Sequence, residues 1–162
     1  MELEGFEFEH ADDESLSVLL NDVFVGAGFA DGAVLHKTLN PAELRTHGEI
    51  VVAKHNREVV GLCMLVEPHS PVRQVAEHNE AEIHLLAVPS HMRRRGVGSA
   101  LLRECVGRVA NRGFRRVVLA TQPMHSYAHG LYQLQGFRRN PARDWMRPGG
   151  GHYWVFERDL ND

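Results

Sequence analysis

The chain has 162 residues and a formal net charge of −3, and 43% of its residues are hydrophobic and 24% are charged. These values are typical of one globular domain, so we expect residues 1–162 to form a single domain around one core. The acidic balance argues against a nucleic-acid-binding protein, and no apolar run approaches the ~20 residues that span a bilayer. Because the acidic first residues also differ from a signal peptide, we expect a cytoplasmic protein with neither nucleic acid nor membrane as partner.

The beginning of the chain predicts a strand, a helix and a loop. Phe6 and Phe8 alternate with glutamates, as in a short strand. Asp12 is expected to cap a helix that ends near Gly26, since the apolar residues between them keep helical spacing. The glycine-rich residues 26–33 show neither period and predict a loop.

A second short helix and a β-hairpin are expected next. Pro41 follows an asparagine and suits the first position of a helix that runs through about Thr46. The runs 49–55 and 58–66 are rich in β-branched residues and are separated by two residues, which predicts an antiparallel hairpin. Residues 67–79 contain two prolines and predict a loop.

The centre of the chain predicts an anion site. An apolar run, residues 81–88, precedes the segment 93–99, which reads Arg-Arg-Arg-Gly-Val-Gly-Ser. A helix is expected from Val97 to Arg112, with Gly113 just past its end. Glycines let the backbone approach a ligand, and the N–H groups of a helix's first turn together with nearby arginines bind phosphate oxygens.

Two common phosphate motifs do not fit this segment. A P-loop ends in Gly-Lys-Ser/Thr, whereas here Gly98 is followed directly by Ser99. The dinucleotide fingerprint requires Gly or Ala where Leu101 stands, and an acidic residue at the end of the next strand, where Ala120 and Thr121 stand.

The last third of the chain completes an α/β pattern. A strand is expected over 115–120, a helix over about 125–135, and a final hairpin from Phe137 whose second arm is 152–160. The order β-α-α-β-β-β-α-β-α-β-β predicts a single-domain α/β fold, with a mixed, mostly antiparallel sheet flanked by helices.

The cysteines and histidines do not predict a metal centre. Cys63 and Cys105 lie in apolar runs without a Cys-x-x-Cys pattern, which is typical of reduced core residues. His125 and His129 are four residues apart on the expected helix, but no carboxylate or cysteine lies near them in the sequence. We therefore expect no bound metal.

The central segment resembles a known family. Arg93, Gly96 and Gly98 match Arg/Gln-x-x-Gly-x-Gly/Ala, the acyl-CoA-binding motif of the GNAT superfamily of N-acetyltransferases. Residues 81–89 are similar to the family's fourth strand. Residues 128–137 are similar to its Ala-x-x-Leu-Tyr-x-x-x-Gly-Phe segment. The resemblance thus extends well beyond the glycine motif.

The resemblance implies acetyl-CoA as co-substrate and a set of residues that hold it. Main-chain groups of the fourth strand and of the arginine–glycine segment, together with side chains of the later helix, would contact the cofactor. The residues are Leu86, Ala87, Val88, Arg93, Arg94, Arg95, Gly96, Val97, Gly98, Ser99, His125, Ala128 and Tyr132. One of them departs from the family pattern, since His125 stands where asparagine is common.

Acyl transfer to an amine also needs a base and an acid. Glu82 and His84 are two residues apart on the expected strand, so their side chains share one face of the sheet. The resemblance implies Glu82 as the base, and His84 is the second candidate because imidazole titrates near neutral pH. Tyr132 matches the tyrosine that protonates the leaving thiolate. In the structural alternatives, Glu82 forms a salt bridge or faces solvent, His84 is a partly buried polar residue, and Tyr132 is a core residue.

The resemblance implies an N-acetyltransferase. It would move an acetyl group from acetyl-CoA to a primary amine of a small molecule or peptide, by direct transfer in a ternary complex. The alternative is a non-catalytic acyl-CoA-binding module. A homodimer through the last strands follows from the family analogy alone.

Overall fold

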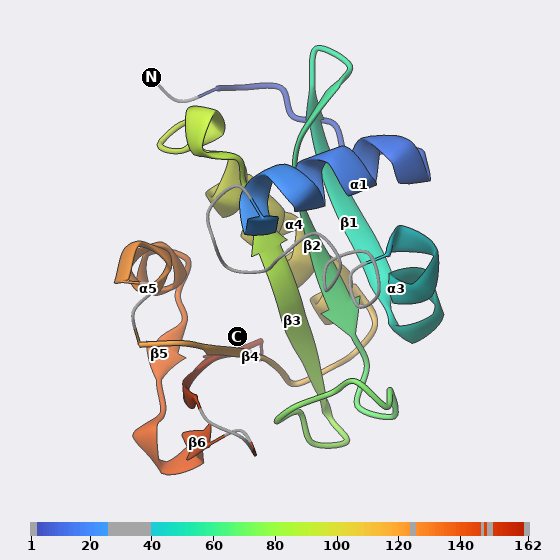
Figure 1. Ribbon diagram of the computed structural model, residues 1–162. Coiled ribbons are helices and arrows are strands. Elements are labelled where there is room, and N and C mark those ends of the chain that lie inside the picture. The colour runs from blue at the N-terminus through green and yellow to red at the C-terminus, as the bar shows by residue number, and fades with distance from the viewer. Residues whose placement is uncertain (1–2, 26–39, 124–125, 147, 149–150, 161–162) are drawn as a thin grey trace. The chain divides into compact units, whose positions relative to one another are not determined.

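The computed structural model describes residues 3–25, 40–123, 126–146, 148 and 151–160 (Figure 1). The chain forms two compact units. The first comprises Met1–Met64 and Leu85–Leu101, and the second comprises Leu65–His84 and Leu102–Asp162.

Helices of the first unit begin at capped residues, as expected. Helix α1 (Asp13–Leu20) begins after Asp12, whose Oδ1 accepts the Ser15 N–H at 2.7 Å, and it continues as a π-helical turn, η1 (Asn21–Val25). Helix α3 (Pro41–His47) begins after Asn40, whose side chain accepts the Ala42 N–H at 2.9 Å. Both predicted helices are confirmed, whereas the loop expected at 26–33 lies outside the described residues.

The predicted strand at Phe6 and Phe8 is wrong. Only Glu7 pairs there, in an isolated antiparallel bridge with Lys54. Gly5 has a φ of 75°, which ends the extended conformation just before the bridge. An alternating pattern was therefore not sufficient to make a strand.

The predicted hairpin is confirmed with the same bounds. Strands β1 (Glu49–His55) and β2 (Glu58–Val66) are joined by Asn56 and Arg57, whose φ values are 50° and 70°. Positive φ at both central residues is the type I′ turn, whose twist matches that of the flanking strands. Within this unit the sheet continues from β1 through β2 to the last residues of β3 (Glu80–Ala87).

Gly61 on β2 lets the beginning of helix α4 (Val97–Asn111) lie directly against the sheet. A Cβ at this position would lie 2.8 Å from Val97 Cγ1, 3.0 Å from Leu101 Cδ1 and 3.2 Å from the Ala87 oxygen. The close approach fixes where the first turn of α4 lies.

We expect Gly61→Ala to lower the free energy of unfolding by about 1–3 kcal/mol, because an added methyl group overpacks this contact. Urea unfolding measures the change. The control is Gly107→Ala on α4, where a Cβ would meet nothing within 4 Å and where alanine favours the helix. Equal stability of Gly61→Ala and the unchanged protein would contradict this account of the packing.

The second unit contains the C-terminal part of the sheet. Its strands follow the order β3, β4 (Arg116–Thr121), β7 (His152–Asp159) and β5 (Arg138–Arg139), and β6 (Trp145–Met146) also pairs with β7. β3 and β4 are parallel, whereas β7 is antiparallel to β4, β5 and β6. The expected mixed, mostly antiparallel sheet is confirmed.

The last hairpin is less regular than expected. Its first arm is divided into β5 and β6 by a 3-10 turn, η3 (Pro141–Arg143). Proline has no N–H to donate to a strand ladder, which explains the break at Pro141. The predicted helix before this hairpin is confirmed as α5 (Ser126–Leu134). Within the described ranges, no helix combines the length and apolarity needed to cross a bilayer.

Candidate active site

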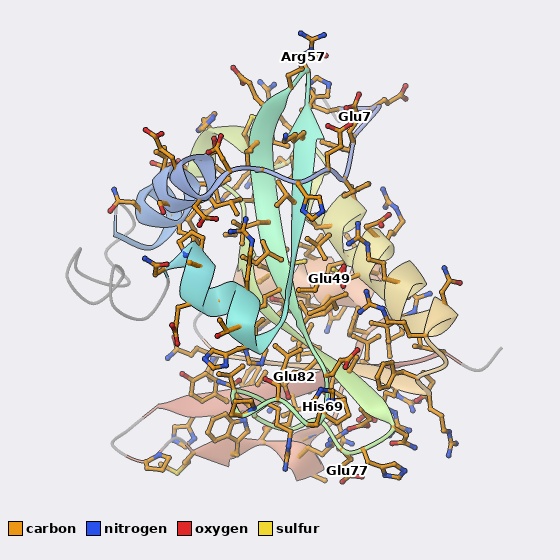
Figure 2. All side chains as sticks on the ribbon, turned by 90° about the vertical axis from the view of Figure 1, so that its right-hand side faces the viewer. Glu7, Glu49, Arg57, His69, Glu77 and Glu82 are labelled. Carbon is orange, nitrogen blue, oxygen red and sulfur yellow. The ribbon has the colours of Figure 1, made fainter. Side chains whose placement is uncertain are left out.

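Glu82 and His84 lie side by side on β3, as their spacing predicts. The Glu82 side chain is fully buried, and His84 Nε2 contacts its Oε2. Oε1 accepts the N–H groups of Val75 at 2.7 Å and Ala76 at 2.8 Å, and Oε2 accepts that of Gln74 at 2.8 Å. Figure 2 shows Glu82 beside the loop that contains these residues. A carboxylate has about four lone-pair sites, so the four contacts use its whole acceptor capacity.

The surroundings of Glu82 keep it ionised. Burial alone would raise the pKa of this carboxyl, but hydrogen bonds from His84 and from the backbone of Val75 and Gln74, together with the charge of His84, lower it below its usual value. Glu82 is therefore a carboxylate at neutral pH.

The contact with Glu82 orients the imidazole of His84. Its side chain is 15% exposed, so it is the part of the pair that solvent reaches. A neutral imidazole that donates its Nε2–H to a carboxylate has Nδ1 as its acceptor atom. Among the residues that the structure describes, no hydrogen bond engages Nδ1.

The strand changes conformation directly after His84. The parallel register of β3 with β4 runs from Glu80–Arg116 to Ile83–Leu119, and Leu85 has a φ of 55°. A left-handed residue inside a strand interrupts the regular ladder and redirects the peptide groups that follow. These groups belong to residues 86–88, whose main chain was expected to contact the cofactor.

The arginine–glycine segment joins β3 to α4 within the first unit. A short 3-10 turn, η2 (Ser90–Met92), precedes it. Arg94 and Gly96 have φ values of 62° and 85°, and the Arg95 oxygen accepts the Leu3 N–H at 2.8 Å. Left-handed residues in a turn aim nearby N–H groups toward a common point, which forms a concave anion site.

The first turn of α4, beside this segment, has N–H groups that no carbonyl of the helix accepts. The Ala100 N–H bonds the Gly96 oxygen at 3.0 Å, so the amides of residues 97–99 have no acceptor within the helix. Val97 is buried, whereas Gly98 and Ser99 are partly exposed at the beginning of the helix. The three arginines are exposed, and in the described ranges their side chains form no hydrogen bond or ion pair: Arg93, Arg94 and Arg95.

Tyr132 lies on α5 in the second unit. It is 7% exposed, and its ring centroid is 5.6 Å from that of Phe156 and 6.2 Å from that of Phe137. Ala128, one helical turn earlier, is partly buried. His125 lies outside the described residues.

The other histidine of this helix has a structural environment. His129 Nε2 lies 3.1 Å from the Gln122 oxygen, and its ring packs between Trp154 and Phe156. In the described part of the chain, no three His, Cys, Asp or Glu side chains are grouped so that they could hold a metal.

Two parts of this arrangement were not expected from the sequence. The backbone of residues 74–76 surrounds Glu82, although this segment was predicted only as a loop. Arg143 donates to the Val75 oxygen at 2.9 Å from 68 residues away in the chain. No local pattern marks a backbone N–H as a partner of a distant carboxylate, so the sequence held no signal for either.

Comparisons with known proteins agree with the motif resemblance. A family model described as the Acetyltransferase (GNAT) family matches residues 7–137. The chain is 28% identical over 98 residues to probable N-acetyltransferase 14 of Xenopus tropicalis, with 60% of this chain and 45% of that protein covered. It is 34% identical over 74 residues to N-acetylaspartate synthetase of Danio rerio, with 45% and 26% covered. The chain thus spans less than half the length of these two relatives.

Solved structures share the fold. The PaiA N-acetyltransferase of Thermoplasma acidophilum, in complex with coenzyme A, superposes with a TM-score of 0.74 at 15% identity and covers 96% of this chain and 99% of its own. The ribosomal-protein-S18-alanine N-acetyltransferase of Escherichia coli has a TM-score of 0.70 at 15% identity, with 98% and 94% covered. With most of its length matched by the family model, the chain belongs to the GNAT acetyltransferase family.

Proposed function

We propose that the protein is an acetyl-CoA-dependent N-acetyltransferase that acts on a primary amine of a small molecule or peptide. The observation that carries the proposal is the buried Glu82–His84 pair, which lies on the strand that leads directly into the arginine–glycine segment. The family membership supports the same activity. Acyl transfer from a CoA thioester to an amine requires both a base and a site that binds the anionic cofactor.

Coenzyme A would bind at the beginning of α4. Its pyrophosphate oxygens would accept hydrogen bonds from the N–H groups of residues 97–99. Arginines 93–95 would add charge-assisted hydrogen bonds. The redirected peptide groups of residues 86–88 would bond the pantetheine arm. One of these N–H groups would also polarise the thioester carbonyl. The family resemblance adds Ala128 and His125 to the proposed cofactor contacts.

His84 is the better of the two candidate bases. All four acceptor positions of Glu82 are occupied and its side chain is buried, so it cannot take a proton without losing one of these four contacts. The His84 side chain is partly exposed, and with Nε2 on Glu82 its Nδ1 would be the atom that accepts the amine proton. In this mechanism Glu82 orients the imidazole and stabilises the imidazolium that forms.

Transfer would proceed directly between the two substrates, through a tetrahedral intermediate. The amine nitrogen attacks the thioester carbon, its proton moves to His84 Nδ1, and the C–S bond breaks as the Tyr132 hydroxyl protonates the departing thiolate. The chain has two cysteines, and both are fully buried, so neither is placed to carry an acyl group. Their burial supports direct transfer in a ternary complex.

We expect Gly98→Val to weaken acetyl-CoA binding by more than about tenfold, which is ~1.4 kcal/mol, because the branched side chain would stand where the pyrophosphate approaches the backbone. Calorimetric titration measures the affinity. Gly107→Val, the same substitution on the exposed middle of the same helix, is the control. Unchanged affinity in a folded Gly98→Val protein would remove the anion site from this segment.

The proposed activity is tested by thiol release. The protein is first titrated with acetyl-CoA and then assayed for free coenzyme A with a panel of small primary amines and peptides with free N-termini. We expect saturable binding and amine-dependent release. Binding without release for every amine would instead indicate an acyl-CoA-binding module, and the absence of binding would contradict both.

A further inference from the structure

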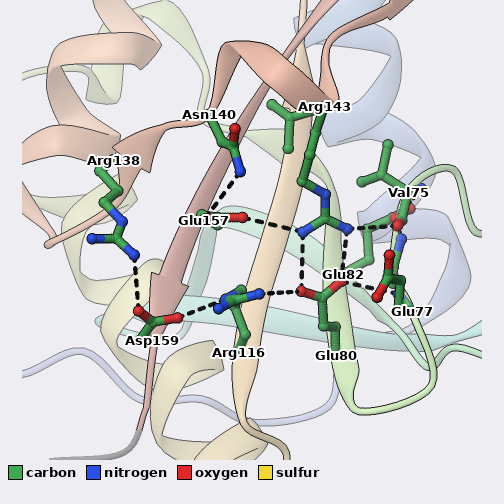
Figure 3. Close-up of polar contacts among 12 residues, drawn as sticks. Val75, Glu77, Glu80, Glu82, Arg116, Arg138, Asn140, Arg143, Glu157 and Asp159 are labelled. Atoms are coloured by element: carbon green, nitrogen blue, oxygen red, sulfur yellow. Dashed lines mark hydrogen bonds and ion pairs between the residues drawn. The ribbon is translucent and has the colours of Figure 1, made fainter.

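Arg143 links three segments of the second unit through one guanidinium group. Nη2 donates to the Val75 oxygen at 2.9 Å and to Glu80 Oε1 at 2.7 Å, while Nη1 donates to Glu80 Oε2 at 3.0 Å and to Glu157 Oε2 at 3.1 Å. Figure 3 shows these bonds converging from β3, from β7 and from the loop before β3. A planar guanidinium is suited to such a set of directed bonds, which an ammonium group cannot reproduce.

The backbone of Val75 is hydrogen-bonded through both its N–H and its carbonyl group. Its N–H donates to Glu82 at 2.7 Å, and its carbonyl accepts from Arg143. The same loop is tied once more, because the Glu77 N–H donates to Glu80 Oε1 at 3.0 Å. The three amides around Glu82 therefore depend on a loop whose position Arg143 and Glu80 determine.

The network is buried and balanced in charge. Glu80 is 1% exposed and Glu157 6%, so each carboxylate needs a cation nearby. Arg143 meets both, and Arg116 on β4 adds a bond to Glu80 at 3.1 Å. Burial would raise the pKa of Glu80, but hydrogen bonds from Arg143, Glu77 and Arg116 lower it below its usual value.

We propose that Arg143 is a positioning residue that holds loop residues 74–76 around Glu82 and thereby sets the orientation of the Glu82–His84 pair. The proposal rests on the proposed function, since the pair matters for turnover only if the protein transfers acetyl groups. Without Arg143 the Val75 carbonyl and Glu80 lose their shared donor, and the loop is released from the side opposite Glu82. Glu82 then loses its backbone donors and no longer holds the imidazole in one orientation.

The variant Arg143→Gln tests this coupling. We expect kcat to fall about 10–100-fold, the range found for outer partners that orient a metal-bound histidine, with KM for acetyl-CoA nearly unchanged. The control is Arg138→Gln, which removes an exposed arginine that pairs with Asp159 at 3.0 Å and does not touch the loop.

A double-mutant cycle distinguishes positioning from a general loss of structure. If Arg143 acts through Glu82, then adding Arg143→Gln to Glu82→Gln should lower kcat little further. Additive losses would overturn the proposal, and so would a folded Arg143→Gln protein with the kcat of Arg138→Gln. Arg143→Lys preserves the charge beside Glu80 and Glu157, so it keeps the comparison possible if Arg143→Gln does not fold.

Hydrogen exchange keeps this test independent of the proposed activity. We expect the amides of residues 74–76 to exchange at least about tenfold faster in Arg143→Gln or Arg143→Lys than in Arg138→Gln. Equal exchange rates would overturn the proposed hold on the loop. If the amides are released but the unchanged protein transfers acetyl to no amine, then the proposed function fails and the loop contact stands.

Discussion

His84→Gln is expected to lower kcat by about 10²–10⁴-fold, the usual contribution of a general base, while the affinity for acetyl-CoA changes little. Glutamine can still bond Glu82, but it cannot accept the amine proton. The acidic limb of kcat, which reports protonation of the base, should disappear. Steady-state kinetics across pH measures both effects.

Two variants make the His84 result specific. His10→Gln introduces the same change at an exposed histidine and should leave kcat unchanged. Glu82→Gln should also lower kcat, because a neutral amide cannot stabilise the imidazolium. If folded His84→Gln turns over at the normal rate with chemistry rate-limiting, while Glu82→Gln does not, then the base is Glu82 and His84 has only a structural function.

Tyr132→Phe is expected to lower kcat by about 10²-fold, the lower part of the range for general acids, because a thiolate leaves without help more readily than an alkoxide. The phenylalanine ring keeps the packing against Phe137 and Phe156, so the free energy of unfolding should change by no more than about 1 kcal/mol. Turnover and thermal unfolding are the measurements.

Tyr153→Phe serves as the matched control for Tyr132. Its ring stacks on that of Trp145 at 4.7 Å and takes no part in the proposed chemistry. Normal turnover in Tyr132→Phe, with the chemical step shown to limit the rate, would assign Tyr132 to the core of the second unit.

Local features of the fold were predictable from the sequence because their causes are local. The caps at Asp12 and Asn40 act over two or three residues, and the turn at Asn56 and Arg57 defines the hairpin around it. The strand expected at Phe6 failed because pairing needs a partner, and only one bridge to β1 forms there. Secondary structure that depends on distant partners was the less predictable part.

The candidate active site also has a part that the sequence predicted and a part that it did not. The period of two along a strand placed Glu82 and His84 on one face, and the structure confirms that they meet. Nothing in the sequence indicated that the Glu82 carboxylate would accept hydrogen bonds from three amides of a loop, because those donors are backbone groups. The bonds of Arg143 to Val75 and Glu80 cross 68 and 63 residues, a separation that only the folded chain can reveal.

Transfer of an isotopic label from acetyl-CoA tests the central claim most directly. The protein is mixed with acetyl-CoA labelled in its acetyl group, with and without an accepted amine, and the products are separated by mass. The account predicts that the label appears on the amine nitrogen, with one free thiol per amide, and that the protein remains unlabelled without amine. Intact acetyl-CoA after incubation with every amine, or label on the protein itself, would contradict direct N-acetyl transfer.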